Sequence, residues 1–200
     1  MPQRRVAVLA YGSILADPGP VLGPMVAEVV PARTPFPVEY GRASARWGGG
    51  PVLVPHPDGG PVDGALLVLA RGLGLGRAVD ALAEREGAPD AGWVVEVAEG
   101  VPAGLQVICA AMPRNLPRPD MAPAALARRA ARSAADGGAR NGVGYLRLAV
   151  ERGIATPRTP AYVEAVLALA GVDGLEAAER RLVALGAARG PREGGRGGLG

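Results

Sequence analysis

The period of the hydrophobic pattern changes once along this chain, near residue 112, and this change limits the folds available to it. Before that point, seven short apolar segments are rich in β-branched residues or alternate between apolar and polar positions, with glycine and proline between them. These segments are residues 6–10, 26–30, 36–45, 51–55, 62–69, 93–97 and 105–112. One helix is predicted among them, over residues 77–86, where Ala78 and Leu82 share a face. Seven strands around one helix predict a closed or strongly curved sheet.

Beyond residue 112, the apolar residues recur at helical spacing. Four helices are predicted, over residues 121–136, 142–153, 159–171 and 175–186. The third is the best delimited, because Thr159 is a natural N-cap, Pro160 suits the first helical position and Gly171 suits the left-handed residue after a helix. Strands followed by helices, with one helix inserted among the strands, is the order of an α+β protein with a helical C-terminal part.

Length and composition predict one domain. Two hundred residues with 48% hydrophobic content are enough for one packed core. We expect this domain to span residues 1–186. Residues 187–200 are rich in glycine and arginine and have no hydrophobic period, so they are predicted to form a disordered tail.

Charge, hydropathy and cysteine content exclude several classes of partner and of covalent or metal cross-link. The net charge is +3, but the arginines are scattered and form none of the dense runs of a nucleic-acid-binding arm. No segment reaches the roughly 18 apolar residues of a membrane-spanning helix, and the N-terminal apolar run is too short for a signal peptide. Cys109 is the single cysteine, so neither a disulfide framework nor a thiolate metal cluster can form. We expect a cytoplasmic protein without nucleic-acid or membrane partners, and the pattern does not indicate an oligomeric state.

Two stretches are similar to functional motifs found in other proteins. The glycines of residues 71–77 follow a strand and precede a helix, as in a dinucleotide-binding fingerprint, but Arg77 stands where the third small residue belongs. Nucleotide binding there is a minor alternative. The single histidine, His56, lies among proline, aspartate and glycine residues typical of an exposed turn, and Ser13 lacks the Gly-x-Ser-x-Gly elbow of many catalytic triads. A triad is therefore disfavoured, and a zinc site more so.

Glu86 is a candidate acid/base residue. It ends the helix predicted over residues 77–86, immediately before Gly87. The negative end of the helix dipole disfavours a charged carboxylate at this position. Partial burial would raise the pKa of Glu86 further, toward the range useful to a general base. The alternative is a solvated side chain next to Glu84 and Arg85.

Several features together resemble the γ-glutamylcyclotransferase-like superfamily. The first strand leads into Tyr11-Gly12-Ser13-Ile14, where family members carry a Tyr-Gly-Ser-Asn or Tyr-Gly-Ser-Leu loop. Glu86 and Gly87 match the family's Glu-Gly pair after a short helix, and Trp93 matches the aromatic residue that follows. Residues 36–55 are similar to the family's strand pair, and residues 141–166 to the C-terminal element of its bacterial branches. The resemblance covers roughly residues 5–170.

This resemblance implies a mixed β-barrel of about six to seven strands with flanking helices and a pocket at one end. In family members, N–H groups of the loop hold the α-carboxylate of a γ-glutamyl group. A glutamate then moves a proton from the substrate's α-amine to the departing amine. Carried over residue by residue, the loop is Gly12, Ser13, Ile14 and Leu15, and the acid/base is Glu86. Further candidate pocket residues are Tyr11, Ser44, Arg46 and Tyr145.

The sequence contains few other catalytic groups, and the chemistry of this reaction does not need them. Closing a five-membered lactam needs a neutral amine, and one carboxylate in a dry pocket can take the amine's proton and return it to the leaving nitrogen. No nucleophile, metal or cofactor is needed. The sequence therefore predicts a γ-glutamylcyclotransferase-like enzyme that releases 5-oxoproline from a small γ-glutamyl substrate. The alternative is a non-catalytic domain of the same fold that binds a small molecule or a protein.

Overall fold

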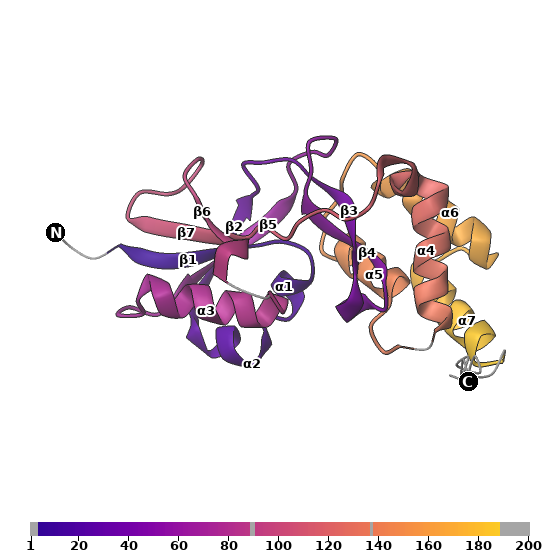
Figure 1. The fold of residues 1–200 in the computed structure, drawn as a ribbon, viewed down its shortest axis with the longest axis horizontal. Helices are drawn as coiled ribbons and strands as arrows, with labels where there is room; N and C mark the ends of the chain where they lie inside the picture. Colours follow the sequence, from indigo (N-terminus) through magenta and orange to yellow (C-terminus); the bar gives the residue numbers. More distant parts are fainter. Residues whose placement is uncertain (1–3, 89–90, 137, 189–200) are drawn as a thin grey trace, which may run out of the picture.

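The computed structural model describes residues 4–88, 91–136 and 138–188 of the chain. Figure 1 shows an elongated arrangement of two parts. One end holds a five-stranded sheet with the first helices of the chain against it. The other end holds a two-stranded sheet that packs against the C-terminal helices.

The five-stranded sheet is mixed, in the order β2-β5-β1-β7-β6. Its strands are β1 (Arg5–Ala10), β2 (Val26–Arg33), β5 (Asp63–Leu69), β6 (Val94–Val97) and β7 (Leu105–Ala110). The central strand β1 runs parallel to β7 and antiparallel to β5. This central place explains the continuous apolar run from Val6 to Ala10, because a strand covered on both faces buries every side chain.

Alternate residues of β1 face two different hydrophobic clusters. Val6, Val8 and Ala10 pack with residues of the helices α2 (Gly19–Leu22) and α3 (Leu75–Glu86). Ala7 and Leu9 belong to the cluster on the opposite face of the sheet. A short helix, α1 (Ser13–Ala16), follows β1 after a two-residue turn. The end of β1 and the end of α3 therefore lie on the side of the sheet that meets the rest of the molecule (Figure 1).

The second part is built on the antiparallel hairpin of β3 (Val38–Ser44) and β4 (Gly50–Pro55). It packs with the helices α4 (Pro123–Ala135), α5 (Gly142–Glu151), α6 (Thr159–Ala170) and α7 (Leu175–Ala187). Buried tyrosines join them: the ring of Tyr40 on β3 meets that of Tyr145 on α5 at 6.5 Å and that of Tyr162 on α6 at 5.0 Å, both edge to face.

A contact between two glycines brings α5 close to the hairpin. A Cβ atom on Gly50 would lie 2.4 Å from the Cα atom of Gly142, so a side chain at this position would displace the helix. The close approach places Tyr145, one turn into α5, next to the end of β1, where its hydroxyl would lie 2.4 Å from a Cβ atom on Gly12.

The predicted α+β class and the helical C-terminal part are confirmed. Each of the seven predicted strands and five predicted helices has a counterpart, at slightly different ends. The helix predicted over residues 159–171 has Arg158, and not Thr159, at its N-cap position, while Gly171 ends it with φ of +63° as expected. A closed barrel is not found in the described part of the chain: β2 and β6 are the edges of an open sheet, and β3 and β4 form a sheet of their own.

The segment predicted as a tail lies mostly outside the described residues. Helix α7 continues to Ala187, and residues 189–200 are not described. Among the residues that are described, no helix is both long and apolar enough to cross a membrane.

Candidate active site

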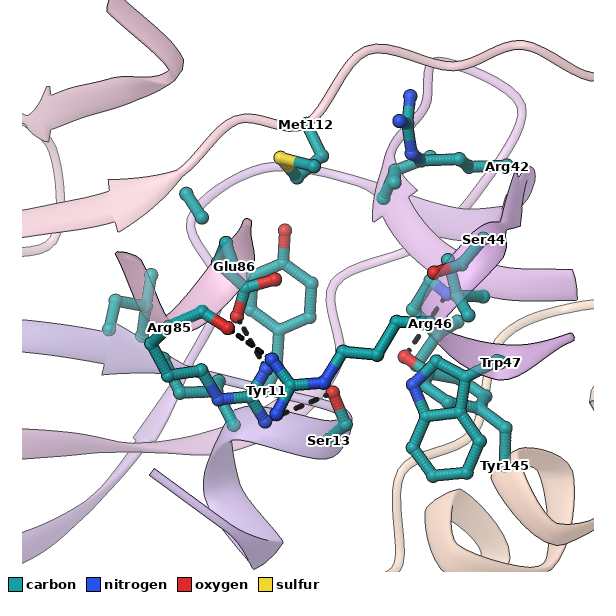
Figure 2. Close-up of a pocket in the computed structure, with 16 residues that line it drawn as sticks. Tyr11, Ser13, Arg42, Ser44, Arg46, Trp47, Arg85, Glu86, Met112 and Tyr145 are labelled. Carbon is teal, nitrogen blue, oxygen red and sulfur yellow. Dashed lines mark hydrogen bonds and ion pairs between the residues drawn. The ribbon is translucent and has the colours of Figure 1, made fainter. Parts of the chain in front are cut away.

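A cavity lies between the two parts of the molecule. The sheet side contributes residues from the ends of β1, α3 and β7, and the hairpin side contributes residues of β3, β4 and α5. Its free volume is about 70 Å³. Figure 2 shows its charged and aromatic lining, with Glu86 and Arg85 facing Arg46 across the cavity.

The turn after β1 forms one wall and is held by Tyr145. Gly12 has φ of +66°, a conformation that side chains other than glycine rarely adopt, and the hydroxyl of Tyr145 occupies the space where a Cβ atom would be. That hydroxyl accepts the N–H group of Leu53 at 3.2 Å, and the N–H group of Ser13 is directed at the same oxygen. Burial raises the pKa of Tyr145 far above its usual range, so the hydroxyl stays protonated. Tyr145 therefore joins α5, β4 and the turn.

Arg85 joins the end of α3 to the same turn. Its side chain is 3% exposed. The guanidinium donates to the main-chain carbonyl of Asp17 at 2.9 Å (Nε) and 2.7 Å (Nη2), and to the hydroxyl of Ser13 at 3.3 Å. Burial lowers the pKa of Arg85, against the attraction of Glu86, but an arginine side chain stays protonated in proteins. The sheet side of the cavity thus contains one buried, fixed positive charge.

Glu86 presents its carboxyl group to this cavity. It is the last residue of α3, which Gly87 ends with φ of +64°. Its side chain is 20% exposed, and one carboxyl oxygen accepts a hydrogen bond from Arg85 at 3.0 Å. Burial raises the pKa of Glu86, and the positive charges of Arg85 and Arg46 oppose part of that rise. A desolvated carboxylate with a raised pKa is a suitable general base.

The hydroxyl of Tyr11 lies near this carboxyl group. Burial raises the pKa of Tyr11 well above its usual range, and the nearby charge of Glu86 adds to the rise. Within the part of the chain that the structure describes, no protein group forms a hydrogen bond with the Tyr11 hydroxyl. A neutral hydroxyl next to Glu86 can donate a hydrogen bond to a bound ligand.

The hairpin side carries two arginines whose hydrogen-bond partners among the described residues are main-chain carbonyls. The guanidinium of Arg46 crosses the cavity and donates to the main-chain carbonyl of Arg85 (Figure 2). The guanidinium of Arg42 donates to the carbonyl of Pro113 at 2.6 Å and lies over the ring of Trp93, 5.5 Å from its centre. Ser44 lies between them on β3, and all three residues line the cavity.

The structure brings seven of the nine candidate site residues to this cavity. They are Tyr11, Ser13, Ile14, Ser44, Arg46, Glu86 and Tyr145. Gly12 and Leu15 are not part of its lining, because Gly12 is covered by Tyr145 and because Ser13 to Ala16 turn into the short helix α1. Of the four N–H groups expected to face a ligand over residues 12–15, that of Ser13 is directed at the hydroxyl of Tyr145.

Sequence reasoning missed Arg42, Arg85, Trp47 and Met112, which also line the cavity. Arg42 could have been found, since it lies two residues from Ser44 on a predicted strand and so shares its face. Arg85 has no comparable local signal, because its acceptors Ser13 and Asp17 are distant in the sequence.

The alternative motifs lie elsewhere. His56 was expected in an exposed turn, but it is only 5% exposed, because Gly41 on the neighbouring strand packs against its ring. Neither His56 nor the glycines of residues 71–77 line the cavity. Across the described ranges, no group of three or more histidine, cysteine, aspartate or glutamate side chains is arranged to hold a metal ion.

Comparison with known proteins does not assign a family. No protein-family model matches the chain, and no curated protein matches it.

Proposed function

We propose that the protein is a γ-glutamylcyclotransferase-like enzyme, which cyclises a γ-glutamyl amide to 5-oxoproline and releases the amine. The observation that carries this proposal is the meeting of Glu86 and the Tyr11–Ser13 turn in one cavity, although about seventy residues separate them in the sequence. In this proposal, the open sheet and the separate hairpin take the place of the family's mixed β-barrel.

The reaction needs a base and an acid that act in turn. Glu86 takes a proton from the substrate's α-ammonium group, and the neutral amine then attacks the γ-carbonyl carbon to form a C–N bond. The protonated Glu86 gives its proton to the leaving nitrogen as the original amide C–N bond breaks. The ring nitrogen, which became positively charged on attack, loses its second proton to the departing amine, which leaves as an ammonium ion. No water is consumed, and Glu86 returns to its ionised form. The raised pKa of Glu86 favours the first transfer, because it makes the carboxylate a stronger base, and the neutral carboxyl group remains acidic enough to protonate the leaving amine.

The surrounding groups have separate tasks in this proposal. Arg46 neutralises the α-carboxylate of the γ-glutamyl group, because it reaches toward Glu86 and its hydrogen-bond partner among the described residues is a main-chain carbonyl. The Tyr11 hydroxyl donates a hydrogen bond to the oxygen that becomes negative during attack. A free volume of about 70 Å³ holds only a few water molecules. Substrate entry therefore requires the exposed side chain of Arg46 to move aside.

The experiment is a comparison of Glu86→Gln with the unchanged protein and with Glu84→Gln, a matched control on the exposed face of the same helix. Each is incubated with a panel of γ-glutamyl peptides and amines, and 5-oxoproline is measured. We expect Glu86→Gln to lose at least about a hundredfold in kcat, within the usual contribution of acid/base catalysis. Equal rates for Glu86→Gln and Glu84→Gln would refute the role of Glu86.

The second candidate is a non-catalytic domain that binds a small γ-glutamyl compound or a related anion. The observation in its favour is the 3.0 Å ion pair between Glu86 and Arg85, which is also what a purely structural carboxylate would form. In that case calorimetry detects binding of the panel compounds, no 5-oxoproline forms, and Glu86→Gln changes binding without changing any rate.

A further inference from the structure

A second cavity lies on the face of the five-stranded sheet that α2 and α3 do not cover. Those helices pack on the other face, below the sheet in Figure 1. The floor of the second cavity consists of buried side chains from the hydrophobic cluster on its own face, among them Leu9, Leu66, Val97 and Val107. Its free volume is about 180 Å³, more than twice that of the cavity that contains Glu86. We call it the sheet cavity.

The sheet curls around this cavity, and a loop covers part of it. Strands β2 and β6 are the two edges of the sheet, yet both contribute lining residues, Val30 from β2 and Val97 from β6 among them. The loop that follows β6 meets the segment that follows β2, since a Cβ atom on Gly100 would lie 3.6 Å from the Cβ atom of Pro35. The sheet cavity therefore has a floor, two walls and a partial cover.

Prolines and a main-chain hydrogen bond restrain the walls and the cover. Pro31, Pro35 and Pro102 all line the sheet cavity. A proline ring fixes φ and has no N–H group, so these residues present rigid apolar surfaces. The N–H group of Arg5 donates to the carbonyl of Gly104 at 3.1 Å, which ties the covering loop to the start of β1. These restraints oppose collapse of the loop onto the floor.

The lining selects for a neutral, apolar ligand. Among the described residues that line the sheet cavity, the charged ones are Arg33 and Glu99, and both are exposed. One charge of each sign gives no net attraction for an ion. An apolar cavity of about 150 Å³ stays dry and takes up benzene or xenon. The sheet cavity, at about 180 Å³, is large enough for one aromatic ring.

We propose that the sheet cavity is a binding site for a small neutral apolar molecule, of the size of one aromatic ring or a short branched alkane. Burial of the ligand's apolar surface against the floor drives binding. The site is distinct from the cavity that contains Glu86: among the described residues, Leu9 alone lines both. The proposal therefore does not depend on the reaction assigned to Glu86.

Benzene and pyrimidine test the apolar character of the site. The two rings have nearly the same shape, but pyrimidine has two nitrogen acceptors that an apolar cavity leaves without partners. Each compound is titrated into the full chain, labelled with ¹³C at leucine and valine methyl groups, and the methyl signals are followed by NMR. We expect benzene to shift the signals of Leu9 and Val107 and to leave those of Leu182, buried among the C-terminal helices, in place. Benzene should bind at least about tenfold more tightly than pyrimidine.

Two variants that fill the sheet cavity locate the bound ring. Ala32 is a half-buried lining residue on β2, so Ala32→Phe should weaken benzene binding at least about tenfold. Ala27→Phe is the matched control, because it adds the same ring at an exposed position of the same strand outside the cavity, and it should leave the affinity unchanged. Val101→Phe fills the cavity from the covering loop and replaces Ala32→Phe if that variant does not fold.

Three results would overturn the proposal. Pyrimidine binding as tight as benzene binding would show that the cavity is polar and filled with water. Unchanged signals of Leu9 and Val107 at high benzene concentration would show that the cavity does not admit the ring. A benzene affinity that neither filling variant lowers would place the ring elsewhere on the molecule. Since none of these measurements follows 5-oxoproline, they stand or fall independently of the proposed cyclisation.

Discussion

Replacement of Arg85 by methionine tests whether one buried side chain both joins the two halves of the site and tunes its acid/base group. Methionine keeps much of the apolar volume and removes the charge. The change leaves the Asp17 carbonyl without two hydrogen bonds, of 2.9 and 2.7 Å, and leaves Glu86 without its 3.0 Å ion-pair partner. Breaking a buried ion pair costs about 3–5 kcal/mol, and we take the lower end, about 3 kcal/mol, because the Glu86 side chain is 20% exposed.

The assay is thermal unfolding followed by circular dichroism at neutral pH. For a chain of this size, about 1 kcal/mol corresponds to about 2–4 °C, so Arg85→Met should lower Tm by about 6–12 °C. Arg77→Met is the control, because Arg77 is an exposed residue of the same helix. It should leave Tm within about 2 °C of the unchanged protein, the range of ordinary surface substitutions.

A double-mutant cycle with Glu86→Gln isolates the ion pair. In the Glu86→Gln background no unpaired charge is left behind, so Arg85→Met should cost at least about 1 kcal/mol less there than in the unchanged protein. An equal cost in both backgrounds would show that Glu86 and Arg85 are not energetically coupled, and our reasoning about the site would be wrong.

Two further predictions concern pH and packing. Because the pKa of Glu86 is raised above its ordinary value of 4.5, the folded state binds more protons than the unfolded state between these two values. The free energy of unfolding from urea titrations should fall as pH rises through this window, and Glu86→Gln should remove that part of the slope. Gly50→Ala should lower the free energy of unfolding by at least about 1–3 kcal/mol, because its Cβ atom would lie 2.4 Å from Gly142. Gly76→Ala has open space at its Cβ position and should not destabilise the protein; equal losses for the two variants would contradict the close approach.

The elements of the fold were largely predictable, and their assembly was not. Alternating apolar residues and intervening glycine and proline residues indicate all seven strands, since both signals are local. The short helices α1 and α2 have four residues each, too few for a helical period to be recognised. Whether β3 and β4 close a barrel depends on contacts with distant segments. Their apolar residues pack with the helices after residue 120, which leaves β2 as an edge strand.

The candidate site was also predictable only where its signals are local in the sequence. Glu86 was a candidate because its place before Gly87 at a helix end is a local feature, and the structure brings it to the cavity. The contact of Ser13 with a tyrosine hydroxyl could not be predicted locally, because that hydroxyl belongs to Tyr145, on a helix more than a hundred residues later. The prediction that His56 is exposed was wrong. Its local sequence is typical of an exposed turn, but in the fold its side chain is buried against Gly41.

The two arginines nearest Glu86 differ in what each can control. Arg85 is 3% exposed and holds the turn after β1, so any change in it alters both the fold and the pKa of Glu86. Arg46 is exposed and bonds one main-chain carbonyl, so it can leave Glu86 without disturbing the structure. In the proposed reaction, Arg46 moves to a substrate carboxylate, where its positive charge would be neutralised and would oppose the rise in the pKa of Glu86 less strongly. The displacement of Arg46 by itself would therefore raise the proton affinity of Glu86 at the step in which the proposed mechanism requires it to accept a proton.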